Sequence, residues 1–224
     1  MVNEGGRDVY QCNIEPPLNF YVSRKMMFGF FKKKDIHEPV EIQRKEALDS
    51  IAAPFREIIG QQYLNGLDCD QLPNGRGVFG SLENPIPVNG SIGEIKYLSK
   101  LRGNTGNALM FHRIGSMSSS VVDNPVDYYE VVCMDGTQWN QLYFDCYHLR
   151  RSNFCPPGYT LMPFNKSLGM DIPGGFGCNR LVSNFPYGLP DALINLYGER
   201  IGGAFARRVQ ESLQVHSFKR LNKI

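Results

Sequence analysis

The sequence predicts an α+β fold: a mainly antiparallel sheet centred on a 126–148 hairpin, packed by N-terminal and C-terminal helices. Alternating apolar residues run on both sides of Asp135-Gly136, and this dipeptide is a strong hairpin signal. Apolar residues recur at threes and fours before and after this region, as in amphipathic helices. Of the 224 residues 42% are hydrophobic and 21% charged, so one core can be buried without metals or disulfides. We expect one domain over residues 35–224, preceded by a tail or edge segment at 1–34.

The amino-terminal segment shows little periodicity and contains Pro16-Pro17. Met26 or Met27 is an alternative start, because MFGFFKKK would make a normal bacterial amino terminus.

The apolar spacing between Val40 and Tyr63 predicts two helices. The first ends near Ala52 and the second begins near Pro54, since proline is tolerated in the first turn of a helix.

The stretch at 70–90 is dense in glycine, proline and asparagine, which predicts a long loop. Loops of this length within a compact domain are often functional, so it is a candidate binding surface. NGSIGEIKYLSKLRG follows and predicts a helix in which Ser91 and Glu94 form a capping box and Gly103 ends the helix. A phosphate site at its start is disfavoured, because Glu94 would repel an anion.

Strands are predicted at 108–114, 126–134 and 137–148. If the chain turns at Asp135-Gly136, alternation divides the side chains of the hairpin between two apolar faces. One face holds Tyr129, Val131, Leu142, Phe144, Cys146 and His148, and the other holds Val126, Tyr128, Val132, Trp139, Tyr143 and Tyr147. A ribbon that is apolar on both sides is typical of the centre of a covered sheet.

Two further strands are expected at 159–162 and 177–182, the latter after the flexible PGGFG. The chain then ends in a helical pattern that begins at Pro190. Gly202-Gly203 weakens its middle, so we expect two helices or one kinked helix.

The stretch FDCYHLRRSNFC at 144–155 has the residue types of a metal or thiol site. Cys146 and His148 share a strand face, but a zinc ion would need Cys155 and Cys178 as well, and their spacing lacks a paired-cysteine pattern. Two residues about 6.5 Å apart on one strand also do not form the thiol and imidazole pair of a cysteine hydrolase. We expect a buried thiol and a hydrogen-bonded histidine with a structural role, and no metal, cofactor or catalytic residue. The sequence leaves open whether these four residues approach one another.

The candidate binding residues are aromatic side chains of the hairpin and basic side chains at strand ends. Trp139, Tyr143 and Tyr147 form an aromatic row, and arginines at strand ends could receive an anion or an acidic partner. The set is Arg113, Trp139, Tyr143, Tyr147, His148, Arg150, Arg151 and Arg180.

The leading hypothesis for function is a protein-interaction module of the inhibitor or immunity type, because common catalytic motifs are absent and aromatic residues are abundant. The alternative is a small-ligand-binding protein or enzyme with a pocket between the sheet and the C-terminal helix. A net charge of +2 disfavours a nucleic-acid partner. No apolar run reaches the roughly 18 residues of a membrane span, and no export signal is present. We therefore expect a cytoplasmic protein whose six cysteines are free thiols.

Overall fold

The computed structural model describes residues 38–134, 136–162, 178–179 and 184–221, and it confirms the α+β class. The predicted tail at 1–34 lies outside these residues. The helices are α1 (Val40–Ser50), α2 (Arg56–Leu64), α3 (Gly90–Lys100) and α4 (Leu189–Leu221), with a 3-10 turn at Ala53–Phe55. The strands are β1 (Ile86–Pro87), β2 (Leu101–Gly103), β3 (Leu109–Met117), β4 (Val126–Cys133), β5 (Asn140–Asp145), β6 (Tyr159–Leu161) and β7 (Cys178–Asn179).

Five strands form the main sheet in the order β1-β5-β4-β3-β7. The central pairs β3·β4 and β4·β5 are antiparallel, whereas β1 and β7 add at the edges in parallel. Tyr129 lies opposite Leu142 and Tyr128 opposite Tyr143, which confirms the register that the alternation predicts. The predicted strand at 159–162 instead pairs with β2 in a separate two-stranded sheet.

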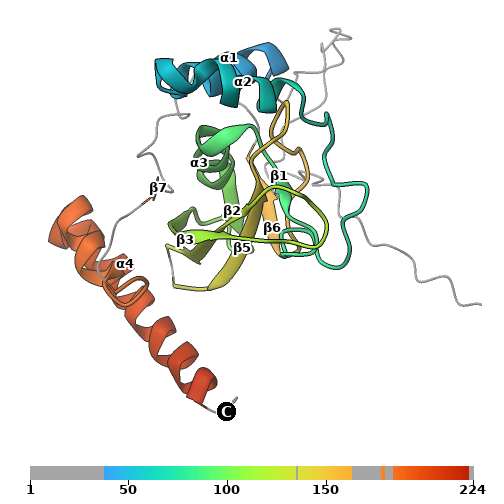
Figure 1. Ribbon diagram of the computed structural model, residues 1–224. Coiled ribbons are helices and arrows are strands. Elements are labelled where there is room, and N and C mark those ends of the chain that lie inside the picture. The colour runs from blue at the N-terminus through green and yellow to red at the C-terminus, as the bar shows by residue number, and fades with distance from the viewer. Residues whose placement is uncertain (1–37, 135, 163–177, 180–183, 222–224) are drawn as a thin grey trace, which may run out of the picture.

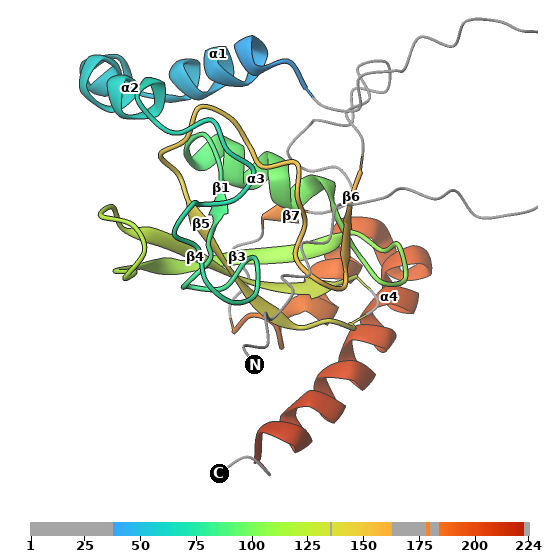
Figure 2. The ribbon, with the colours of Figure 1, turned by 90° about the vertical axis from the view of Figure 1, so that its right-hand side faces the viewer.

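Helices cover both faces of the sheet, with α3 on one side and α4 on the other (Figures 1 and 2). The first face packs Phe111, Tyr129 and Phe144 of the sheet against Tyr97 and Leu98 of α3. The second face packs central strand residues against both parts of α4. Its buried members are Ala108, Met110, Val132, Met134, Leu189, Leu193, Val209 and Leu213. Both apolar faces of the predicted hairpin are therefore covered, as expected for a central ribbon.

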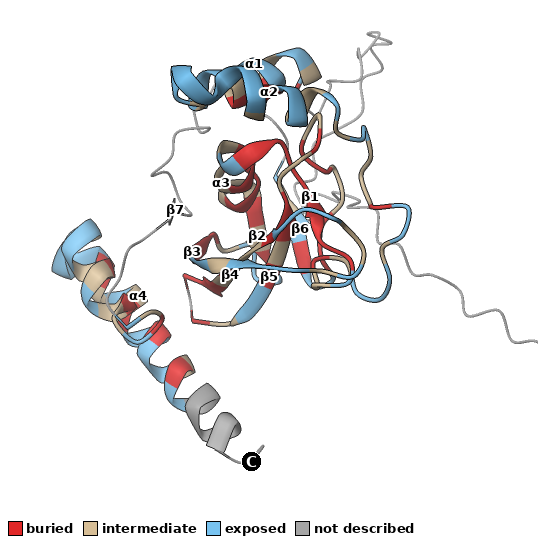
Figure 3. Ribbon diagram, viewed as in Figure 1, coloured by how far each residue is buried: buried red, intermediate tan, exposed pale blue. Residues whose placement is uncertain are grey.

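The two amino-terminal helices lie over α3 and form the outermost layer, which is largely exposed (Figure 3). Their boundaries agree with the prediction, but the apolar stripe does not form a core: Phe55 is 57% and Ile58 69% exposed. Polar contacts attach α1 instead. Glu46 lies 2.5 Å from the Nζ of Lys96 on α3, and the buried carboxylate of Glu38 pairs with Arg151.

The expected capping box at the start of α3 is wrong. The helix begins after Asn89, whose side chain makes no cap and donates to the backbone oxygen of Gln43 at 2.7 Å. Glu94 cannot reach back to the helix start, because its side chain is fully buried against the sheet. The sequence pattern predicts Glu94 as a capping residue at the surface, whereas the structure places it as a buried acid.

The carboxyl-terminal helix is interrupted, as predicted, although at a different glycine. The break lies at Gly198, whose backbone has φ 75° and ψ 165°, a conformation that glycine adopts without strain. Gly202 lies beyond the break, where a Cβ atom would come within 2.3 Å of the backbone oxygen of Leu193. The second glycine thus allows the two helical parts to pack closely.

The expectation that all six cysteines are free thiols is wrong for Cys155, which is disulfide-bonded. Its partner is none of Cys69, Cys133 and Cys146, which form no disulfide. Because Cys155 is oxidised, the cysteines no longer support the expectation of a reducing compartment.

Within the described part of the chain, no helix has both the length and the apolar character needed to cross a membrane.

Candidate functional site

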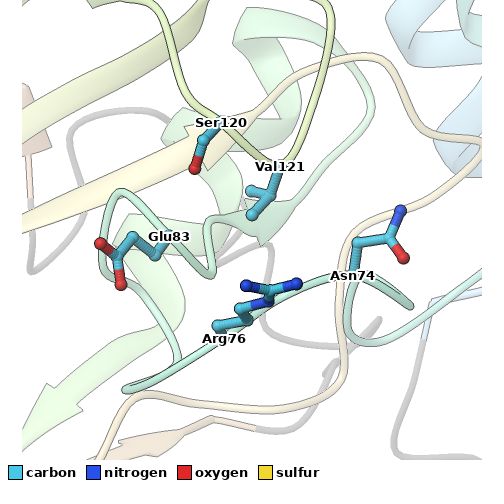
Figure 4. A pocket seen from close by; sticks show the side chains of 5 residues that line it. All are labelled: Asn74, Arg76, Glu83, Ser120 and Val121. Atoms are coloured by element: carbon cyan, nitrogen blue, oxygen red, sulfur yellow. The ribbon is translucent and has the colours of Figure 1, made fainter.

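Two adjoining hollows lie between the loop that follows α2 and the connection between β3 and β4. The larger has a volume of about 420 Å³ and is lined by Asn74, Arg76, Glu83, Ser120 and Val121 (Figure 4). The smaller, of about 280 Å³, shares Asn74 and Val121 with it and therefore continues it. We call the two together the loop groove.

The groove wall is fixed by hydrogen bonds within its own loops. The backbone N–H of Arg76 donates to the oxygen of Glu83 at 2.8 Å, and that of Gly80 donates to the oxygen of Asn84 at the same distance. The hydroxyl of Ser119 donates to the backbone oxygen of Leu82 at 2.8 Å and so joins the two loops. Because these bonds hold both walls, the groove is formed in advance of any ligand.

The larger hollow presents one cationic and one anionic side chain. Arg76 and Glu83 are both exposed, and within the described residues neither side chain makes an ion pair or a hydrogen bond. Figure 4 shows the carboxylate of Glu83 pointing away from the guanidinium of Arg76. The apolar side chains of Leu67 and Val78 stand 55% and 62% exposed on the same long loop. The groove thus offers separate binding groups for a ligand that carries both charges.

The inner wall of the smaller hollow is formed by Asp145, Tyr147 and His148. Strand β5 ends at Asp145, and the chain then runs beside the segment after β1, with Gly90 N donating to the oxygen of Cys146 and His148 N to that of Val88. This turn brings the imidazole Nε2 of His148 to 2.9 Å from Oδ2 of Asp145. Strand alternation predicts that Cys146 and His148 share one face. In the structure the strand ends before both residues, and His148 contacts Asp145.

His148 is a buried cation at neutral pH. Burial disfavours its charged form, but the hydrogen bonds and charges of Asp145 and Cys69 outweigh burial and raise its pKa to about 9. The Nδ1 atom lies 3.2 Å from the backbone oxygen of Leu67 and 3.7 Å from the Sγ of Cys69. The ring therefore ties the loop after α2 to the end of β5.

A buried acid cluster lies between α3 and the sheet. Oε1 of Glu94 accepts from the thiol of Cys146 at 2.9 Å, and Oε2 accepts from the hydroxyl of Tyr129 at 2.9 Å. Burial raises the pKa of Glu94 to about 8, although the hydrogen bonds from Cys146 and Tyr129 oppose this rise. Burial also raises the pKa of the Cys146 thiol and that of the Tyr129 hydroxyl, so all three groups stay protonated at neutral pH.

Asp127 lies beside this cluster and, unlike Glu94, has a lowered pKa. Burial would raise its pKa, but a two-bond contact with Arg113, at 2.7 Å for each oxygen, holds that pKa below its ordinary value. Glu94, Asp127 and Cys146 offer ligand atoms within 4.8 Å of one another and could in principle hold a metal ion. The arginine already bound to Asp127 and the protons on Glu94 and Cys146 oppose a cation here. The donor set therefore fits a proton-sharing cluster better than a metal centre.

Among the predicted site residues that the structure describes, Tyr147 and His148 line the groove. The aromatic row is divided. Trp139 donates to Glu130 and packs edge-on against Tyr187, in the cluster between the sheet and α4. Tyr143 stacks on Tyr128 with 5.7 Å between ring centroids.

The predicted arginine cluster is divided among separate acidic partners. Arg113 binds Asp127, Arg150 binds Asp68 and Asp70 at 2.5 Å each, and the buried Arg151 pairs with Glu38. Arg180 lies outside the described residues. These described arginines connect segments of the fold, so their charges are already neutralised.

Sequence reasoning missed several residues of both sites: Cys69, Arg76, Glu83 and the buried Glu94. The length of the loop at 70–90 is itself a signal, and it leads to Arg76 and Glu83. A signal for Cys69 is its position beside a long loop, but its contact with His148 spans 79 residues of sequence. Comparison of the chain with protein-family models, curated proteins and solved structures yields no match.

Proposed function

We propose that the protein is a protein-interaction module whose loop groove binds an extended segment of a partner protein. The observation that carries this proposal is the pair of unpartnered, oppositely charged side chains, Arg76 and Glu83, in a preformed polar groove within the described residues. Amide side chains beside them, among them Asn74 and Asn124, both donate and accept hydrogen bonds, as a peptide backbone requires.

The electrostatics of the groove define the segment. Arg76 attracts an acidic side chain and Glu83 a basic one, and this complementarity fixes the direction in which the segment lies. The exposed Leu67 and Val78 add apolar contact on the same loop. The partner segment is thus polar, carries both charges at a fixed spacing and has apolar residues at its ends.

The alternative of a ligand pocket between the sheet and the C-terminal helix has less support. Trp139, a predicted lining residue of that pocket, packs in the hydrophobic cluster of the layer together with Phe185, Tyr197 and Phe205. We also propose a cytoplasmic location, which rests on the sequence analysis alone. The disulfide at Cys155 weighs against it. Cell fractionation of the native protein decides this point.

The proposal is tested with random peptides displayed on phage and selected on the immobilised full-length protein. We expect the selected peptides to share one acidic and one basic residue at a constant spacing. Arg76→Glu and Glu83→Arg should each abolish binding of those peptides. The double exchange should bind peptides in which the two charges are interchanged, because the complementarity is then reversed.

The matched control is Glu199→Arg, which reverses an exposed charge on α4, away from the groove. This variant should bind the selected peptides as the unmodified protein does. Selected peptides that bind equally well to the two single groove variants would overturn the proposal, as would a selection with no shared charge spacing.

A further inference from the structure

A thiol, an imidazole and a carboxylate stand in line beside the loop groove. The Sγ of Cys69 lies 3.7 Å from Nδ1 of His148, and Nε2 of the same ring lies 2.9 Å from Oδ2 of Asp145. A nucleophile within reach of a base, with the base oriented by a third group, is the arrangement that covalent catalysis requires. The three residues come from two distant parts of the sequence, so the alignment is a product of the fold.

The three groups differ in burial: the nucleophile is partly exposed, and the two residues behind it are buried. Cys69 is half-buried and a free thiol, whereas His148 and Asp145 are 3% and 4% exposed. Cys69 is therefore more exposed than the ion pair behind it. The imidazole orientation is fixed, because Asp145 holds Nε2 and leaves Nδ1 for the sulfur and the oxygen of Leu67.

The charges around the sulfur are balanced. Asp68 and Asp70 flank Cys69 in the sequence, but Arg150 binds both carboxylates at 2.5 Å. Among the side chains that face His148, Asp145 is anionic and Cys69 is the thiol itself. The imidazole is thus the cationic group that contacts the sulfur, and it stabilises negative charge there.

We propose that Cys69 is a nucleophilic thiol that takes an acyl group from an ester, with His148 carrying the proton and Asp145 positioning the imidazole. A bond forms between the sulfur and the carbonyl carbon, and the bond from that carbon to the leaving alcohol breaks. The reacting form is the Cys69 thiolate paired with the His148 imidazolium, and the imidazolium gives its Nδ1 proton to the leaving oxygen. Water then adds to the thioester and gives one proton to the neutral imidazole, which releases the carboxylic acid and restores the thiolate-imidazolium pair. This activity goes beyond the peptide binding proposed for the groove and does not depend on it.

The test uses p-nitrophenyl acetate and the full-length protein. We expect an initial burst of p-nitrophenolate that equals the number of acetyl groups attached to Cys69, followed by slower release as water cleaves the thioester. Mass spectrometry of the digested protein locates the acetyl group. Cys133 and Cys146 serve as internal references, because Cys133 is buried and the thiol of Cys146 is bonded to Glu94 and has a raised pKa. The native protein should acetylate Cys69 at least several-fold faster than the urea-unfolded protein at the same pH, since only the fold brings His148 to the sulfur.

Three variants complete the test. Cys69→Ala should abolish the burst of p-nitrophenolate. His148→Gln should slow acetylation at least about tenfold, because a positioned proton-transfer group typically raises a rate by this much or more. Asp145→Asn should shift the pH profile of acetylation, which a purely structural role would leave in place. As a control, Cys133→Ala should leave the burst unchanged. The proposal is overturned if the native protein carries no acetyl group on Cys69, or if it reacts there no faster than the unfolded chain, and this comparison holds even if His148→Gln fails to fold.

Discussion

The thiol of Cys146 donates a hydrogen bond to the carboxyl group of Glu94 across 2.9 Å, from the end of β5 to the buried side of α3. The hydroxyl of Tyr129 donates to the other oxygen, so a single acid connects one helix to two strands. Because this acid is fully enclosed, the cluster is stable only while Glu94 keeps its proton.

The free energy of unfolding should fall as pH rises from about 4.5 to about 8. The folded-state pKa of Glu94 is raised to about 8, so the unfolded chain releases this proton at lower pH than the native protein does. The contribution is fully present below the unfolded pKa and is lost as pH rises through the folded one. It amounts to a few kcal/mol, because a difference of one in pKa between the two states corresponds to about 1.4 kcal/mol. Urea unfolding at several pH values measures it.

Glu94→Gln should remove the contribution of Glu94 to that slope, most clearly between pH 4.5 and 6.5, because the amide does not titrate. The fall above pH 6.5 that His148 causes should remain. We expect the variant to be less stable than the unmodified protein at pH 5 and to lose this disadvantage towards pH 8. Glu57→Gln, at an exposed position on α2, is the control and should parallel the unmodified protein. An equal slope in Glu94→Gln would show that other groups cause the pH dependence.

Asp145→Asn should destabilise the protein most at low pH. The pKa of His148 is raised to about 9 from its ordinary 6.5, so the stability gained from the ion pair is fully present below about 6.5 and lost through about 9. Breaking a buried pair typically costs about 3–5 kcal/mol. We expect a cost of that order at pH 6 and a smaller one at pH 9.5, measured by urea unfolding. A cost that is independent of pH would contradict the imidazolium assignment.

Gly66→Ala should destabilise the loop after α2. A Cβ atom there would come within 2.1 Å of the backbone oxygen of Tyr147 and 2.7 Å of the Cα of His148. Since backbone atoms cannot move aside cheaply, we expect a loss of about 2–4 kcal/mol in the free energy of unfolding, measured with urea. Gly115→Ala is the control, because its nearest contact, with Tyr128 at 3.6 Å, is an ordinary one. A cost for Gly66→Ala no larger than that of the control would contradict the close packing.

Arg150→Ala should loosen the loop around Asp68 and Asp70 with little effect on global stability. Both ion pairs are partly exposed, and such pairs contribute about 0–1 kcal/mol each. Amide hydrogen exchange should accelerate at residues 67–73 and stay unchanged in β3 and β4. Arg207→Ala, on an exposed turn of α4, should change neither region. Faster exchange throughout the sheet in Arg150→Ala would show that the arginine supports the whole fold.

The three central strands of the sheet, and helices before and after them in the sequence, follow from residue patterns alone. Alternation around Asp135-Gly136 predicts the pairing of Tyr129 with Leu142 and the two faces of the ribbon, because side-chain direction in a strand has a period of two. Periodicity likewise predicts the ends of α1 and α2 to within a few residues. These are local properties, and each can be read from neighbouring residues.

Which polar groups are buried and which segments meet became evident only in the packed molecule. Periodicity favours Phe55 and Ile58 as core, yet they are exposed, and a capping pattern favours Glu94 as surface, yet it is enclosed. The contact of Cys69 with His148 and the meeting of residues 74–83 with 120–121 join parts of the chain that no periodicity relates. Burial and hydrogen bonding depend on the whole packed arrangement, whereas helix and strand patterns depend on a few consecutive residues.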